Sequence, residues 1–442
     1  AEATPPFSFG VGIFRDAPST DEPDWTMAWK NHGLWFEKGK DFSFHVGGMI
    51  QYDAVWFATT DTMQQTPGPG RFQDGVAPRR LRMRTEGTLY ENFEFLLEFD
   101  FGNHFLSPDD ENGPEAATFN VPALTDAYVT IKQVPWLGKV RIGNQREPFT
   151  LELQNSSRYL TFMERSYLFD ALSLSGFSNG RQPGILFLRT WAEDRLFGSA
   201  GVFKSESNAF GFGLGDGDYA ITSRWGLLPL WRPEDESWWW LGAAYSHRDP
   251  ANDMLRARAR NSVRGAPATL ANVIADTGVY FADSEDLFNL QTAASLGSFT
   301  LQSEYVATLT EGARATATSA PGNLAYHGAY AELSYLLTGE HRSWDAANAR
   351  MDPVVPKRPW KPGRGECGRG AWEIGCRFQI LDLVDAPING GRLQNATLGV
   401  NWYWNPNMKM QFNYDYLWRD PYGLDPARGS VHGFGTRMAV FF

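Results

Sequence analysis

The feature that most constrains this chain is a two-residue rhythm of apolar and polar side chains, which recurs from about residue 42 to the end. In one segment Leu97, Phe99 and Phe101 alternate with Glu98 and Asp100. Successive side chains of a strand point to opposite faces, so the rhythm predicts strands with one apolar and one polar face. Helical periodicity is almost absent, and no run of about 18 apolar residues occurs, which excludes a helical membrane span.

Sixteen such segments can be counted along the chain. They lie at about 42–58, 79–90, 93–102, 124–132, 138–147, 183–191, 196–205, 219–230, 238–248, 287–296, 299–309, 326–338, 370–382, 393–404, 408–418 and 433–442. An even number is typical of bacterial transmembrane barrels, whose two ends lie on one side of the membrane. We therefore predict an all-β, 16-stranded antiparallel transmembrane β-barrel over residues 42–442, preceded by an N-terminal periplasmic segment over residues 1–41.

The connections between these segments alternate in length. Tight turns follow residues 90, 296 and 404, whereas 59–78, 103–123, 148–182 and 249–286 are long and rich in Pro, Gly and Asp. Short periplasmic turns and long extracellular loops are the expected asymmetry. Residues 339–369 form a long connection on the short-turn side, so either the strand count slips there or this segment has a role of its own.

Composition supports a membrane surface and limits the possible partners. Aromatic residues make up 14% of the chain and include 17 Trp, as expected for an apolar belt between two water interfaces. The net charge of −11, without an RNA-binding signature, argues against a nucleic-acid partner. Neither Cys367 and Cys376 nor the seven histidines show metal-ligand spacing, so we expect no metal and no cofactor. A disulfide between the two cysteines is left open, and the sequence AEATPPFSFG looks like the start of a mature or an engineered chain.

Several phrases of the sequence resemble the phosphate-selective porin O/P family of bacterial outer membranes. They are FEKGKDFSFHVGGMIQYDAVWF (36–57), RIGNQREPFTLE (141–152), SSRYLTFMERS (156–166), YLLTGEHRSWD (335–345), GAWEIGCRF (370–378) and TLGVNWYWNPNMKMQFNY (397–414). They occur in order and cover nearly the whole chain from about residue 36. The resemblance implies a 16-stranded barrel in the outer membrane, a homotrimer, and passive diffusion of anions such as phosphate or polyphosphate.

The phrase RRLRMRTEG (79–87) carries the first group of candidate anion-binding residues. Leu81 and Met83 would face lipid, so Arg80, Arg82 and Arg84 would face a water-filled lumen, because an arginine at the lipid midplane costs about 2–4 kcal/mol. Guanidinium groups bind phosphate oxygens in a bidentate fork, so a column of them forms a series of weak sites. Arg79 and Arg80 also fall where the resembling family has basic residues. The alternative is a generic porin wall, in which these arginines pair with glutamates and set only the field.

Two long connections carry further candidates. In 249–286 these are Arg256, Arg258, Arg260 and Arg264, and around the connection that begins near residue 148 they are Arg141, Arg146, Arg158 and Arg165. The first group continues the arginine column if its loop folds back into the mouth, as the resemblance suggests. The second group lies on or near the third extracellular connection, which in porins commonly narrows the pore. The alternatives are a solvated charged loop for the first group and loop anchoring for Arg158 and Arg165.

The long segment 339–369 adds Lys357, Arg358 and Lys361. The resemblance implies that this segment reaches into the channel and contributes lysines to the constriction, and an ammonium group is a good point charge for phosphate. The alternative is a periplasmic flap stiffened by prolines.

Three classes of function therefore compete. The chain is an anion-selective porin, a porin of broad or different selectivity, or a barrel enzyme. Carboxylates with lumen-facing parity, among them Glu94 and Glu304, argue against strict anion selectivity. An enzyme needs a nucleophile, a base and an orienting group on one face, and His45, His247 and His327 offer no such set, so we expect no catalysis.

Overall fold

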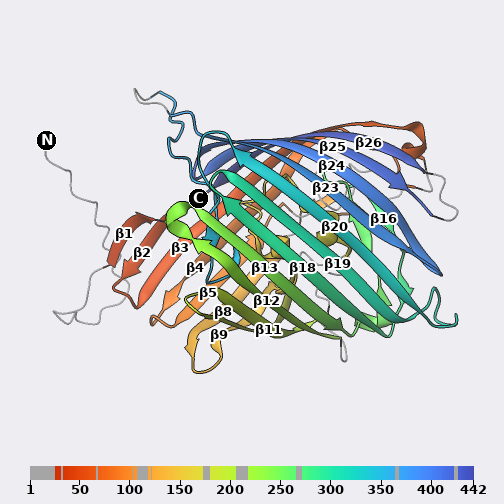
Figure 1. The fold of residues 1–442 in the computed structure, drawn as a ribbon, viewed down its shortest axis with the longest axis horizontal. Coiled ribbons are helices and arrows are strands. Elements are labelled where there is room, and N and C mark those ends of the chain that lie inside the picture. Colours follow the sequence, from red (N-terminus) through yellow and green to blue (C-terminus); the bar gives the residue numbers. More distant parts are fainter. Residues whose placement is uncertain are drawn as a thin grey trace.

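The computed structural model describes residues 25–30, 33–65, 68–102, 104–106, 118–120, 122–172, 180–205, 218–264, 271–363, 368–422 and 427–442. Eighteen of its strands form one sheet, and sixteen of these close into an antiparallel barrel (Figure 1). The barrel strands are β3 (Phe42–Thr59), β4 (Gly75–Leu89), β5 (Phe93–Asp100), β8 (Ala123–Val134), β9 (Gly138–Arg146), β10 (Arg181–Trp191), β11 (Leu196–Lys204), β12 (Tyr219–Arg232), β13 (Ser237–Arg248), β18 (Ser284–Leu296), β19 (Phe299–Ala313), β20 (Gly322–Leu336), β23 (Ala371–Asp385), β24 (Ile388–Asn405), β25 (Met408–Asp420) and β26 (Gly429–Phe441). The predicted sixteen-stranded barrel is confirmed.

The barrel closes where the last strand meets the first. β26 runs antiparallel to β3, from Val431 opposite Thr59 to Phe441 opposite Met49. Every wall strand therefore has two hydrogen-bonded neighbours, as a strand in lipid requires. In the described part of the chain, no helix is both long and apolar enough to cross a membrane.

A hairpin precedes the barrel and extends its sheet. β1 (Trp25–Lys30) pairs with β2 (Gly33–Lys38), and β2 pairs with the start of β3, where Trp35 lies opposite His45. β26 does not reach this part of β3. The hairpin projects beyond the end of the barrel that carries the C-terminus (Figure 1).

Side-chain exposure on the wall is the reverse of that in a soluble protein. Large apolar side chains are exposed on the outside, for example Met83 at 54% and Leu398 at 57%, whereas Gln51 and Arg437 are fully buried inside. Such inversion suits a wall with lipid outside and polar groups within. It confirms the prediction that Met83 faces outward while Arg80 and Arg82 face the lumen.

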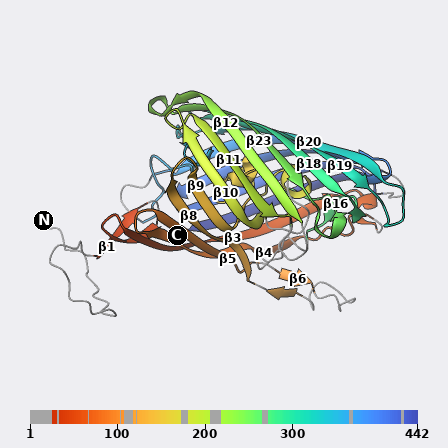
Figure 2. The same cartoon turned by 90° about the horizontal axis from the view of Figure 1, so that it is seen from below.

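Shorter elements lie in the connections. They are η1 (Asp61–Gln64), η2 (Pro233–Asp235), η3 (Ala251–Asp253), α1 (Leu151–Gln154), α2 (Tyr167–Ala171), and the two-stranded pairs β6 (His104–Leu106) with β7 (Thr118–Asn120), β14 (Met254–Leu255) with β17 (Tyr280–Phe281), β15 (Arg258–Arg260) with β16 (Val273–Asp276), and β21 (Trp344–Asp345) with β22 (Arg350–Met351). The β6–β7 pair stands away from the barrel wall (Figure 2).

Residues 147–172, which we name the constriction loop, fold into the barrel and carry α1 and α2. Three inward-facing glycines of the wall, Gly375, Gly399 and Gly435, make room for this loop. A Cβ on Gly399 would lie 3.0 Å from Phe162 Cε1, and one on Gly435 would lie 2.8 Å from Met163 Sδ. The absence of side chains at these positions therefore lets the loop lie directly against the wall.

Residues 337–370, which we name the rim segment, enter the barrel from the short-turn end. Trp344 packs against Trp238 and Trp240, with ring centroids 4.6 and 5.3 Å apart. Arg342 is fully buried and donates to Glu373 at 2.9 Å. The long connection is therefore a separate feature of the barrel and does not reflect a slip in the strand count.

Candidate functional site

The arginine column of β4 lines the lumen and contains one more member than alternation predicts. Arg80 and Arg82 are buried, and Arg84 is half-buried. Arg80 lies opposite Gln51, but Pro78 lies opposite the next residue, Tyr52. Arg79 is therefore the extra residue of a β-bulge, which turns its side chain to the inside as well.

A single carboxylate of the constriction loop, Glu164, binds several arginines near the β-bulge of β4. Glu164 accepts two hydrogen bonds from Arg79, both at 2.9 Å, and one from Arg437 at 2.8 Å. Arg80 donates to both of its oxygens at 3.4 and 3.2 Å, and Arg264 Nε lies 3.6 Å away. Burial alone would raise the pKa of Glu164, but these four guanidinium groups hold it well below its usual value. The loop therefore presents a permanent negative charge to the column.

The other members of the column also have acidic partners. Arg82 donates to Asp100 at 2.7 Å and to Glu98 at 3.1 Å, and Arg84 lies 2.7 Å from Glu86. The arginine column predicted from the sequence is present. Its arginines also pair with glutamates, here Glu86 and Glu98, as the alternative of a generic porin wall expects.

Arg146 and Arg165 bind main-chain oxygens of the constriction loop. Arg146 Nη1 donates to the carbonyls of residues 153, 154 and 155, at 2.8–3.2 Å. Arg165 donates to the carbonyls of Glu152 and Asn155, at 2.9 and 2.7 Å. The last carbonyls of a helix have no partner within it, so these arginines satisfy the end of α1.

The other end of α1 is bound by the barrel wall. The main-chain N–H groups of Leu151 and Glu152 each donate to the Glu304 carboxylate at 2.8 Å. The constriction loop is thus anchored at both ends of α1. Arg158 differs, because it donates to the Gly48 carbonyl at 3.1 Å and has no carboxylate bonded to it within the described part of the chain. Burial and the nearby charge of Arg84 lower its pKa to about 10, so it stays charged at neutral pH.

The loop between β13 and β18 contacts α2 of the constriction loop. Arg260 and Arg264 donate to Asp170 of α2, at 2.9 and 2.6 Å. Burial would raise the pKa of Asp170, but the two arginines hold it below its usual value. Arg256 binds Asp276 through a bidentate contact, and Arg258 lies opposite Asp276 in the β15–β16 pair. These cations therefore join the two loops to each other.

Lys357, Arg358 and Lys361 do not lie in the lumen. All three are exposed at the periplasmic end of the barrel, because the rim segment turns back over the wall after Val354, which still packs on the inside against Leu336 and Tyr403. The expectation that they contribute to the constriction is therefore corrected, and the rim segment brings Arg342 and Arg350 inside instead. Cys376 is exposed on the outer face of β23, and Cys367 lies outside the described residues.

Sequence reasoning missed several residues that hold the site together. Besides Glu164 and Asp170, Lys409 is buried and donates to the Leu160 carbonyl at 2.9 Å, and Arg181 donates to Asp126 at 2.8 Å. The sequence did contain one signal for Glu164 and Asp170. Both lie in a connection that was expected to enter a lumen rich in arginine, and a buried carboxylate there needs a cationic partner.

Half-buried cations within the lumen gather on one wall. Besides Arg79 and Arg146, they include Arg84 of β4, Lys132 of β8, Lys139 and Arg141 of β9, and Arg350 of the rim segment. Arg141 lies over the Tyr128 ring at 4.2 Å and donates to Thr130 at 3.1 Å. A cavity of about 330 Å³ at the periplasmic end is lined by Lys132, Lys139 and Ala347, among others. Water therefore reaches cationic groups along β4, β8 and β9.

The comparison with protein families decides the identity of this barrel. The family described as phosphate-selective porin O and P matches residues 44–442. The chain belongs to this porin family. Porin O of Pseudomonas aeruginosa is 25% identical over 431 residues, which cover 91% of this porin and 89% of its relative. An uncharacterized protein of Caulobacter vibrioides is 26% identical over 463 residues, covering 99% and 82% of the two chains.

Solved outer-membrane channels share the fold of this porin. Pseudomonas putida OprB is 12% identical with a TM-score of 0.52, and the match covers 91% of this chain and 94% of that one. OmpT of Vibrio cholerae is 10% identical with a TM-score of 0.50, covering 92% and 99%. Family and fold together place the porin in the bacterial outer membrane.

Proposed function

We propose that this outer-membrane porin is selective for anions and gives phosphate-like anions a passive path along the β4, β8 and β9 wall. The observation that carries the proposal is the set of half-buried cations on that wall. Arg141 is the central one, because its only described hydrogen bond goes to a hydroxyl group, and it has no carboxylate partner among the described residues.

The chemistry of these side chains fits a diffusing anion. A guanidinium group offers a bidentate fork to phosphate oxygens, and an ammonium group offers a point charge. Conduction needs several sites that are each attractive enough for entry and weak enough for exit. Arg84, Arg158 and Arg141 would bind near the constriction, and Lys139 and Lys132 would bind toward the periplasmic cavity. The description of the matching family, phosphate-selective porin O and P, agrees with this substrate class.

A second candidate function is a porin of broad selectivity, in which the basic residues only shape the field. The pairing of Arg79, Arg80 and Arg82 with carboxylates favours it, because a paired guanidinium attracts a permeating anion less. We infer from the resemblance that the porin is a homotrimer and that it transports without catalysis.

Planar-bilayer recordings of the purified porin distinguish the two candidates. Under a chloride gradient the reversal potential should indicate anion preference, and sub-millimolar phosphate should block the chloride current. Arg84→Gln with Arg141→Gln should weaken both effects. Arg392→Gln is the matched control, because Arg392 is exposed at the loop end of β24 and bonds Asp382. Cation preference, or a current that phosphate does not change, would contradict the proposal.

A further inference from the structure

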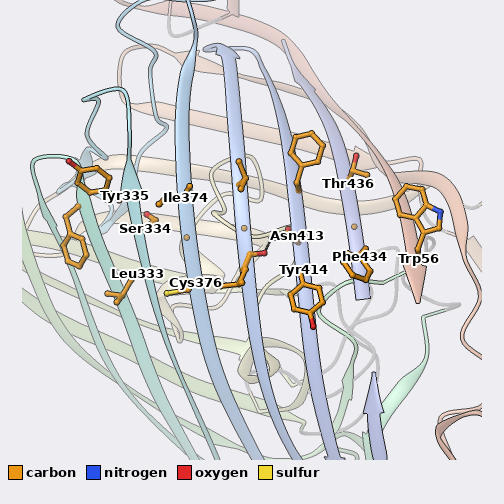
Figure 3. A pocket seen from close by; sticks show the side chains of 17 residues that line it. Trp56, Leu333, Ser334, Tyr335, Ile374, Cys376, Asn413, Tyr414, Phe434 and Thr436 are labelled. Atoms are coloured by element: carbon orange, nitrogen blue, oxygen red, sulfur yellow. Dashed lines mark hydrogen bonds between the residues drawn. The ribbon is translucent and has the colours of Figure 1, made fainter. Parts of the chain in front are cut away.

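The outer wall of the barrel carries a hollow that follows from the glycines inside. Gly375 lies opposite Gly399, Gly399 opposite Asn413, and Asn413 opposite Gly435. All four positions face the inside of the barrel. On the outer face, only main-chain atoms are therefore present at the level of these residues. Outward apolar side chains border it on both sides: Ile374, Val400 and Phe412 on one, and Cys376, Leu398, Tyr414 and Phe434 on the other (Figure 3). The hollow encloses about 680 Å³.

An aromatic cluster lies next to the hollow, toward the periplasmic end. Trp372 and Trp402 are one outward position beyond Ile374 and Val400, which is roughly 7 Å along a strand. Their rings stack at 5.2 Å, and Trp360 of the rim segment packs on Trp402 at 5.1 Å. Tryptophan is typical of the level of lipid head groups, because one end of its ring is apolar and the other is polar.

The rim segment is fixed against this part of the wall. Trp360 N–H donates to the Trp404 carbonyl at 2.6 Å, and Gly370 N–H donates to the Arg358 carbonyl at 3.0 Å. A Cβ on Gly368 would lie 2.1 Å from the same Arg358 carbonyl oxygen, so the returning chain passes directly beside it. Main-chain contacts therefore hold the peptide around Trp360 in one position.

Two cations flank Trp360 at the surface. Arg358 and Lys361 are exposed, and neither side chain has an ion pair with a described residue. Lys357 is less available, because its ammonium group donates to the Gly339 carbonyl at 2.6 Å and lies 3.9 Å from Glu236. Positive charge, an aromatic platform and an apolar hollow thus follow one another from the membrane surface into the lipid.

We propose that this surface binds one phospholipid of the periplasmic leaflet with an anionic head group. Arg358 and Lys361 contact the head-group phosphate, Trp360 and Trp402 lie at the glycerol level, and an acyl chain fills the hollow. Charge complementarity selects an anionic lipid. Continuity with the lipid-facing wall favours an acyl chain over another protein. The proposal concerns the outer face only and does not depend on the selectivity of the channel.

Native mass spectrometry of the intact porin tests this site. The porin is equilibrated with equal amounts of phosphatidylglycerol and phosphatidylcholine that have the same acyl chains. We expect one phosphatidylglycerol to be retained per chain. Arg358→Gln with Lys361→Gln should lower its retention at least about tenfold, because each cation near a lipid surface contributes roughly fivefold. Filling the hollow by Cys376→Phe should lower retention of both lipids.

Matched controls come from other parts of the same surface. Lys40→Gln with Arg189→Gln removes two cations elsewhere on the periplasmic end, and Leu290→Phe adds an outward ring on β18; both should retain the lipid as the wild type does. Equal retention of the two lipids, or no effect of the Arg358 and Lys361 changes, would overturn the proposal. It would also be overturned if Cys376→Phe altered only the number of subunits, because the hollow would then lie between copies of the chain.

Discussion

Glu164 is the carboxylate on which four arginines converge. Under the proposed function, its carboxylate competes with a phosphate-like anion for the N–H donors of these guanidinium groups. The sequence predicted Arg80, Arg82 and Arg84 as a lumen column because strand alternation is local. Alternation could not place the Arg79 side chain on the inner face, because the bulge depends on pairing with β3. It also could not predict the role of Glu164, because its contact with Arg79 joins residues 85 positions apart.

Replacing Glu164 by Gln should weaken the constriction and free its arginines. The loss of one partner from a buried ion-pair network should lower the free energy of unfolding by about 3 kcal/mol. Anion preference should rise at the same time, because Arg79 and Arg80 lose their internal carboxylate. Urea unfolding in vesicles and reversal potentials measure the two effects. Glu86→Gln, which removes one half-buried partner of Arg84, should cost less than about 1 kcal/mol; an equal cost for both changes would contradict the role of Glu164.

Met83→Arg tests the assignment of the outer face. Met83 is 54% exposed on the lipid side of the column, so an arginine there should cost about 2–4 kcal/mol if it lies near the midplane. Met83→Leu should be nearly neutral. The stability of the folded barrel in vesicles measures both, and normal stability of the arginine variant would show that the strand faces are reversed.

At the level of elements, the strands were predictable and the inner loops were not. Alternation identified the wall, but it fails at Leu383 and Val384, where a register shift interrupts it, so the long β23–β24 hairpin was predicted too short. The β1–β2 hairpin was missed, because alternation in β1 is incomplete: Ala28 lies between Met27 and Trp29. The contacts of the constriction loop join distant parts of the chain, and no local pattern reports them.

Gly399→Val should push the constriction loop away from the wall. A side chain there meets Phe162, and overpacking of this kind costs about 1–3 kcal/mol. Single-channel conductance should change because the loop lies inside the barrel. Gly75→Val is the control, since a Cβ at Gly75 has no described atom within 4 Å. Unchanged conductance in Gly399→Val would show that the loop does not set the size of the path.

The ion pairs that Glu164 and Asp170 form with arginines should resist moderate acid. The folded pKa values of Glu164 and Asp170 lie below their usual values near 4, so the stability that these groups contribute is complete above that range. It is lost only as the pH falls through the lower folded values. The contacts of Glu164 with Arg79 and of Asp170 with Arg264 should therefore persist from about pH 8 to 5 and be lost only below about pH 4, which infrared difference spectra against E164Q and D170N measure. Protonation of either carboxylate between pH 7 and 5 would contradict this assignment.

For the whole molecule, closure of the barrel is the property on which the rest depends. The pairing of β26 with β3 begins at Met49, so the hairpin over residues 25–38 adds to the sheet without completing the cylinder. The sequence predicted the strand number. It also predicted an N-terminal periplasmic segment over residues 1–41, whose described hairpin joins the barrel sheet through β2. The course of the rim segment, first inside and then outside, could not be predicted, because Trp344 and Trp360 are equally apolar and only their packing partners differ.

A chain that begins at residue 42 should therefore still form the barrel. Removing the hairpin loses the stacking of Trp35 on His45, at 4.9 Å, but leaves all sixteen wall strands paired. Refolding into detergent, followed by the shift in gel mobility between heated and unheated samples, measures this outcome. A chain lacking residues 429–442 is the control and should not refold. Failure of the 42–442 chain would show that the hairpin is part of the folding unit.

The rim segment connects the inside of the barrel with its outer face. Trp344 in its inner part packs against Trp238 and Trp240 of β13, and sixteen residues later Trp360 packs on Trp402 and Trp404 on the outside of β24. The rim segment therefore passes around the periplasmic end of the barrel. It cannot leave the lumen unless the contacts of Trp360 with Trp402 and Trp404 are broken first. The part of the rim segment inside the barrel is therefore held in place by the part around Trp360, which lies on the lipid-facing side.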